Sequence, residues 1–176
     1  MESTAKDIKQ RKAAAWRACG KMNKIWKSTL SRKFKLRLFA STVESVLLYG
    51  CEAWTITPKL QKELDGCYTR MLRAVLNVNW KQHIPNTQLY GDLPKISQKI
   101  RKRRTRFAGH CYRSEEPVSK LVHWIPKHGK RKPGRPALTF IDLLKQDTGL
   151  ETSDIKTAMN DRRVWRSIVD RGQDPN

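Results

Sequence analysis

Apolar side chains recur at three- and four-residue intervals along most of this sequence, and this helical periodicity limits the chain to an all-α fold. The clearest example begins at Thr57, which is placed to cap a helix, followed by Pro58 in the first helical turn. The apolar residues that share one face of this helix are Leu60, Leu64, Cys67, Met71, Leu72 and Val75.

Several other segments show the same periodicity or the same end signals. In the first half of the chain, the predicted helices are residues 8–27 and a helix that is capped by Ser31 and ended by Gly50. Farther along, Pro94 opens a helix, and residues 139–147 and 161–170 form two more, with a short helix capped by Thr152 or Ser153 and ending at Ala158 between them. Residues 86–92 predict a short helical turn, whereas the β-branched and aromatic residues in 51–57 favour an extended segment. Proline and glycine make residues 127–136 a loop.

These patterns divide the chain into three parts. We expect a helical bundle in residues 1–80, a basic helix followed by a basic glycine- and proline-containing loop in residues 81–136, and a small C-terminal helical unit in residues 137–176.

Positive charge is the strongest indication of function. The chain has 37 Lys and Arg against 16 Asp and Glu, a net charge of +21. Residues 1–141 alone carry 31 bases and nine acids, whereas the remainder is nearly balanced. Such an excess favours a polyanionic partner. In residues 99–106, basic side chains lie on nearly all sides of the predicted helix. A membrane-surface helix instead has one bulky apolar face, so this arrangement favours RNA or DNA as the partner.

The candidate nucleic-acid-binding residues are basic side chains near the start of the second predicted helix, within the third predicted helix, in the densest basic run and in the glycine- and proline-containing loop. They are Lys33, Lys35, Arg37, Arg70, Arg73, Lys99, Arg101, Lys102, Arg103, Arg104, Arg106, Lys130, Arg131, Lys132 and Arg135. Trp80 and Trp124 lie in predicted non-helical segments and are the better candidates for stacking on bases.

Catalytic patterns are missing from the sequence. A two-metal polymerase or nuclease site needs clustered carboxylates, and the only adjacent acidic pair, Glu115 and Glu116, reads as a solvated turn. We therefore assign no catalytic residue, no metal ligand and no cofactor to this chain. One zinc hypothesis stays open, because His110, Cys111, His123 and His128 fall within 19 residues, although the usual paired cysteines are missing.

The compartment follows from composition. No apolar stretch approaches the length of about 20 residues that spans a bilayer, and the first residues are too polar for a secretory signal. The cysteines Cys19, Cys51, Cys67 and Cys111 are few and irregularly spaced, as in a chain with free thiols. We expect a nuclear or cytoplasmic location rather than secretion.

Five segments resemble LINE-type (non-LTR) retrotransposon reverse transcriptases, in the order found in that family. They are residues 47–55 (LLYGCEAWT), 64–73 (LDGCYTRMLR), 103–113 (RRTRFAGHCYR), 134–142 (GRPALTFID) and 161–165 (DRRVW). The resemblance implies the helical thumb, roughly residues 8–80, and the C-terminal extension that follows it. It also implies that the catalytic aspartates and their Mg²⁺ belong to an upstream palm that is not in this sequence.

Three functions remain open at this level. The first is a binding module that grips an RNA–DNA hybrid or target duplex through phosphates and works beside the palm and fingers of the parent polymerase. The second is a truncated part of an RNA-directed DNA polymerase that polymerises only with its palm. The third is a transposon-derived chromatin or protein-interaction module stabilised by zinc.

Overall fold

The computed structural model describes residues 2–123 and 138–171, and over these residues the chain is helical without a strand. This confirms the predicted all-α class. The chain divides into two compact units, Met1–Ser97 (unit 1) and Gln98–Asn176 (unit 2). The division into three parts, with boundaries after residues 80 and 136, stays a prediction.

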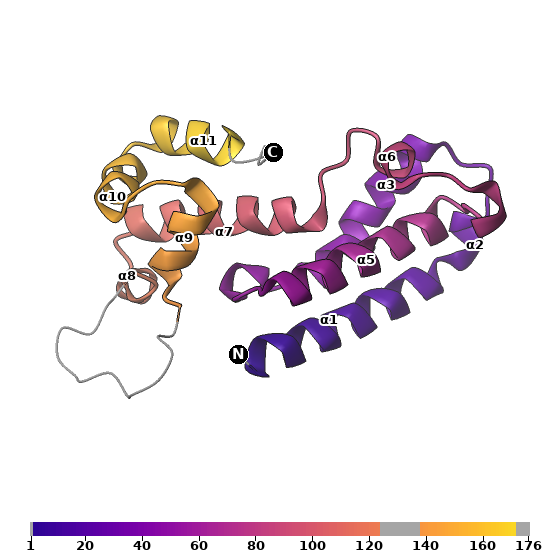
Figure 1. The fold of residues 1–176 in the computed structure, drawn as a ribbon, viewed down its shortest axis with the longest axis horizontal. Coiled ribbons are helices and arrows are strands. Elements are labelled where there is room, and N and C mark those ends of the chain that lie inside the picture. Colours follow the sequence, from indigo (N-terminus) through magenta and orange to yellow (C-terminus); the bar gives the residue numbers. More distant parts are fainter. Residues whose placement is uncertain (1, 124–137, 172–176) are drawn as a thin grey trace. The chain divides into compact units, whose positions relative to one another are not determined.

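Unit 1 is built around two long helices that run side by side, α1 and α5 (Figure 1). Its helical elements are α1 (Glu2–Lys21), α2 (Asn23–Trp26), α3 (Arg32–Phe39), the π-helical η1 (Ala40–Glu44), α4 (Ser45–Leu47), the 3-10 turn η2 (Cys51–Ala53), α5 (Pro58–Val75), the 3-10 turn η3 (Trp80–Gln82) and α6 (Asn86–Tyr90). Both predicted caps are confirmed: the side chains of Ser31 and Thr57 accept the backbone N–H groups of Phe34 and Leu60.

Three boundaries in unit 1 differ from the sequence-based expectation. The first predicted helix begins earlier, at Glu2, and breaks at Met22 into α1 and α2. The second predicted helix contains a π-helical turn, where the Thr42 and Ser45 hydroxyls donate to carbonyl groups of the preceding turn. The expected extended segment instead starts with the 3-10 turn Cys51–Ala53, after Gly50 in the left-handed conformation.

The core of unit 1 combines apolar packing with buried hydrogen bonds. The indole N–H of Trp26 donates to the Cys19 carbonyl oxygen at 2.8 Å. The hydroxyl of Tyr68 donates to the Glu44 carboxylate at 2.7 Å, and burial is the largest cause of a raised Tyr68 pKa. All four cysteines are buried, and none of them is in a disulfide bond in the part of the chain that the structure describes.

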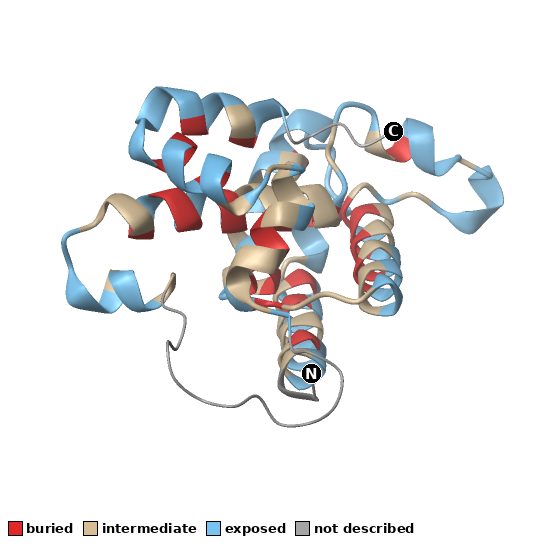
Figure 2. Ribbon diagram, turned by 60° about the vertical axis from the view of Figure 1, so that its left-hand side comes forward, coloured by how far each residue is buried: buried red, intermediate tan, exposed pale blue. Residues whose placement is uncertain are grey.

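Unit 2 wraps four shorter helices around α7. Its elements are α7 (Ile96–Arg113), which begins in the last two residues of unit 1, α8 (Pro117–Leu121), α9 (Phe140–Thr148), α10 (Thr152–Asn160) and α11 (Arg162–Arg171). The short α8 was not predicted. Buried positions (red in Figure 2) recur along one side of the helices, and exposed positions fill the other side.

The core of unit 2 joins α7 to α9, α10 and α11. Its buried members are Ala108, Leu144, Ile155, Ala158, Met159, Trp165 and Val169. A capping box starts α9, because the Thr139 hydroxyl oxygen accepts the Asp142 N–H while the Asp142 carboxylate accepts the Thr139 N–H. Helices α7 and α11, which form the candidate site, are therefore parts of one packed unit.

Candidate nucleic-acid interface

Helix α7 has one buried face and one cationic face. Its buried face includes Ile96, Ile100, Ala108 and Cys111. Phe107 does not belong to this buried face, because its side chain is 40% exposed, whereas its neighbour Ala108 faces the core. The small alanine lets other helices of unit 2 approach α7 closely.

This second face carries a row of basic side chains that we call the α7 basic stripe: the cations Lys99, Arg103 and Arg106, followed by His110. Intervals of four, three and four residues place these side chains on the same side of the helix. Arg103, Arg106 and His110 are exposed, and Lys99 is partly exposed. At a rise of 1.5 Å per residue the stripe spans about 16 Å, the length of several phosphates along one nucleic-acid strand.

Arg104 does not belong to this surface, although the sequence made it a candidate. It is 4% exposed, and its Nη1 atom donates to Oδ2 of Asp147 at 2.7 Å. Arg101 also faces Asp147, with 3.7 Å between Nε and Oδ1. Burial raises the pKa of Asp147, while the charges of Arg104 and Arg101 oppose this shift. Arg104 thus ties α7 to α9 inside unit 2, and we leave it out of the proposed interface.

Lys102 is held by α11 rather than directed away from the protein. Its Nζ atom lies 2.8 Å from the Oδ1 atom of Asp170. The hydrogen bond from Lys102 is the largest cause of a lowered Asp170 pKa, and the charges of Arg106 and Arg166 act in the same direction. These two arginines are therefore close enough to Asp170 for their charges to act on one carboxylate.

Trp165 fixes α11 against α7. Its indole N–H donates to the Thr105 carbonyl oxygen at 2.8 Å, and its side chain is 2% exposed. A Cβ atom at position 109 would overlap the Cδ1 and Nε1 atoms of this indole, so glycine is required there. The basic stripe and the basic residues of α11 are thereby held in one rigid arrangement.

The structure adds two arginines that the sequence analysis did not select. Arg106, Arg162 and Arg166 line a hollow of about 280 Å³ together with Trp165 and Val169. Arg162 and Arg166 are exposed. Their four-residue spacing in a predicted helix was a usable signal, but the nearly neutral charge of the C-terminal segment obscured it.

The candidates in unit 1 fall into two groups. Lys33 and Arg37 are exposed one turn apart on α3, and Arg70 is exposed on α5. Lys35 is 7% exposed and its ammonium group donates to the Trp26 carbonyl oxygen at 2.6 Å. Arg73 donates to the Ile84 carbonyl and to the Asn86 side chain, at 2.8 and 2.9 Å. Lys35 and Arg73 thus have structural partners of their own.

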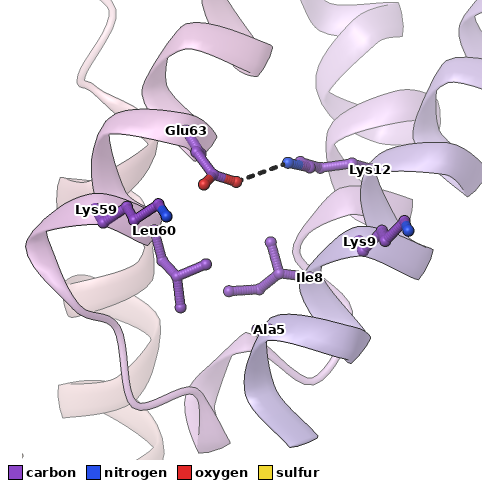
Figure 3. Close-up of a pocket in the computed structure, with 7 residues that line it drawn as sticks. All are labelled: Ala5, Ile8, Lys9, Lys12, Lys59, Leu60 and Glu63. Carbon is purple, nitrogen blue, oxygen red and sulfur yellow. Dashed lines mark hydrogen bonds and ion pairs between the residues drawn. The ribbon is translucent and has the colours of Figure 1, made fainter. Parts of the chain in front are cut away.

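A groove of about 620 Å³ between α1 and α5 also bears charged residues (Figure 3). Ile8 and Leu60 form its apolar part, and Lys9, Lys12, Lys59 and Glu63 surround them. The Lys12 ammonium lies 3.3 Å from the Glu63 carboxylate. Lys9 and Lys59 are exposed, and they provide cationic positions outside both α7 and α11.

The zinc hypothesis is only partly covered by the structure. The Nε2 atom of His123 donates to the Ala108 carbonyl oxygen at 3.0 Å, and its ring packs edge-on against Tyr112 and Phe140. Burial is the largest cause of a lowered His123 pKa. Cys111 is buried, and burial raises its pKa. His128 lies outside the described residues, and within residues 2–123 and 138–171 no three His, Cys, Asp or Glu side chains converge as a metal site would require.

Five further candidates lie outside the described residues. They are Lys130, Arg131, Lys132, Arg135 and Trp124. Trp80, the other stacking candidate, is 75% exposed, and the ammonium of Lys81 lies 6.0 Å from its ring centroid. In the part of the chain that the structure describes, no helix is both long and apolar enough to cross a bilayer.

Together these features define a class: an all-α protein whose helix α7 carries a row of cations on a rigid helical unit. The chain is 25% identical over 179 residues to an uncharacterized transposon-derived protein of Caenorhabditis elegans. The alignment covers 94% of this chain and 64% of that relative, so the chain spans somewhat less than two thirds of its length. No family model matches the sequence, and no solved structure matches it.

Proposed function

We propose that this chain is a transposon-derived nucleic-acid-binding region that holds RNA or DNA mainly through its phosphates. The α7 basic stripe is the observation that carries the proposal. Its cations project from one side of a helix whose opposite side is buried, so their positions are set by packing before any ligand binds. The net charge of +21 supports attraction to a polyanion.

The finer proposal is that the chain corresponds to the thumb and C-terminal extension of a non-LTR retrotransposon reverse transcriptase. Two independent supports favour this origin: the five sequence segments that resemble that family, and the similarity to a transposon-derived protein. In this proposal the catalytic carboxylates and Mg²⁺ belong to the palm of the parent polymerase. This chain contributes grip on the template–primer or target duplex and catalyses no reaction by itself.

The test is fluorescence anisotropy of the purified chain with a labelled RNA–DNA hybrid, duplex DNA and single strands at 50 and 200 mM salt. If six to ten phosphates are neutralised, affinity falls by about 10³ to 10⁵ between these salt concentrations. Preference for the hybrid supports the thumb proposal. Absence of binding at the lower salt concentration contradicts nucleic-acid binding and favours the protein-interaction alternative.

A matched pair of double variants separates the stripe from generic charge. Lys99→Gln with Arg103→Gln should weaken binding by about tenfold and make the salt dependence shallower by about two phosphates. Lys9→Gln with Lys59→Gln removes the same charge from unit 1, where these side chains are exposed, and should change affinity much less. Equal losses in the two variants would contradict a role for the stripe.

A further inference from the structure

The hollow between α7 and α11 brings three arginine side chains together beside the buried side chains of Trp165 and Val169. Arg106 enters from α7, while Arg162 and Arg166 enter one turn apart from α11. Each guanidinium carries five N–H donors in a planar fork that matches a phosphate group. We call this hollow, lined by these three arginines with Trp165 and Val169, the α7–α11 groove.

The chemistry of the groove selects a phosphate over a nucleobase. Trp165 lies at its floor but is 2% exposed, and its indole N–H is already bonded to the Thr105 carbonyl oxygen. The ring is therefore not accessible for stacking on a base. The rim presents arginines, which are suited to phosphate oxygens.

Charge next to the groove also favours an anion. The Lys102–Asp170 ion pair lies beside the groove, and its two opposite charges cancel each other. The three arginines therefore leave a local excess of positive charge. Their charges help to lower the Asp170 pKa, since Arg106 and Arg166 both act on that carboxylate. A bound phosphate would relieve repulsion among the three guanidinium groups.

We propose that the α7–α11 groove binds one phosphate group of a polynucleotide backbone, held by Arg106, Arg162 and Arg166. This inference rests on the proposed function and extends it, because it makes α11 a second contact element. Arg106 belongs to both the stripe and the groove, so one strand that follows the stripe reaches the groove without leaving unit 2. Two helices that hold one backbone fix its register more firmly than a single row of cations.

The test compares two double variants of α11 with equal charge. Arg162→Gln with Arg166→Gln removes two of the groove arginines. Arg163→Gln with Arg171→Gln removes two arginines of the same helix that do not line the groove. Binding of the labelled duplex or hybrid is measured as a function of salt, and thermal melts by circular dichroism establish that both variants fold like the wild type.

The groove variant should lose about tenfold in affinity, with a salt dependence shallower by about one phosphate, and the control should lose clearly less. Arg162→Lys with Arg166→Lys keeps the charge but removes the planar forks, so it should lose part of the affinity. This conservative variant supplies the comparison if the glutamine variant melts early.

Four results would overturn the inference. If the wild type binds and the groove and control variants lose equal affinity, the groove has no special role while nucleic-acid binding stands. If inorganic phosphate, compared with chloride at equal ionic strength, binds through Arg162 and Arg166 while the groove variant keeps the wild-type affinity for the polynucleotide, the groove is a free-phosphate site. If polyglutamate binding depends on these arginines as strongly, the groove serves an acidic protein. If the wild type binds no nucleic acid, the proposed function fails with it.

Discussion

Replacing Gly109 with alanine should destabilise unit 2, because the indole of Trp165 on α11 packs directly against this position of α7. The added Cβ would overlap the Cδ1 and Nε1 atoms of Trp165. The indole is buried and cannot swing into solvent without leaving the core cluster of unit 2. The ring or the whole of α11 must therefore move.

The magnitude follows from three opposing contributions. Overpacking a close-packed core costs about 1–3 kcal/mol. Displacing the indole also stretches its hydrogen bond to the Thr105 carbonyl oxygen, and leaving a buried donor unsatisfied costs about 1–3 kcal/mol. The higher helix propensity of alanine returns about 1 kcal/mol. We expect a net loss of about 1–5 kcal/mol in the free energy of unfolding.

Gly66 provides the matched control. It lies inside α5, it is exposed, and no heavy atom stands within 4 Å of a Cβ built on it. Gly66→Ala should therefore gain about 0.5–1 kcal/mol from helix propensity alone. Urea unfolding followed by far-ultraviolet circular dichroism measures both variants. If Gly109→Ala is as stable as the wild type, the close approach of Trp165 to α7 is wrong.

Three further changes test the buried polar groups. Asp147→Asn removes the charge that faces Arg104 inside unit 2 and should cost about 3–5 kcal/mol in urea unfolding; a loss under 1 kcal/mol would contradict the buried pair. Because the pKa of His123 is lowered in the folded protein, the unfolded chain takes up a proton at this residue first as pH falls. The stability that neutral His123 contributes should therefore be lost below its ordinary pKa of 6.5. His123→Phe should flatten the change in melting temperature between pH 7.5 and 5.5, and an unchanged slope would exclude His123 as the source of that change. Tyr68→Phe removes the hydroxyl that donates to Glu44 and should cost about 1–3 kcal/mol in urea unfolding, whereas a neutral result would contradict that bond.

Local signals in the sequence were sufficient to predict the main helices and several of the residues at which they begin. Ser31 and Thr57 cap the helices that they were expected to cap. Thr139, predicted only as the first residue of a helix, caps α9 through a capping box. These motifs act between residues three or four apart, so no tertiary contact is needed to recognise them. The π-helical turn at Ala40–Glu44 could not be recognised in this way, because the apolar pattern continues across it.

The basic run of α7 shows the limit of sequence reasoning about the site. Composition alone made Arg103 and Arg104 equivalent, yet one is exposed and the other is buried against Asp147. Successive helical residues point about 100° apart, so only the packing direction of the helix decides which cation meets solvent. Arg162 and Arg166 were not predicted, because they become a candidate site only together with Arg106, which lies in a distant part of the chain.

The sequence by itself determined the all-α class, the main helices and the strong positive charge, because periodicity, capping and net charge are local or additive properties. Tertiary structure alone decided which cations share a surface. Trp165, which packs over Gly109 and bonds to Thr105, places the arginines of α11 beside Arg106. That juxtaposition joins side chains about 60 residues apart in sequence, and it follows from long-range packing that no local pattern encodes.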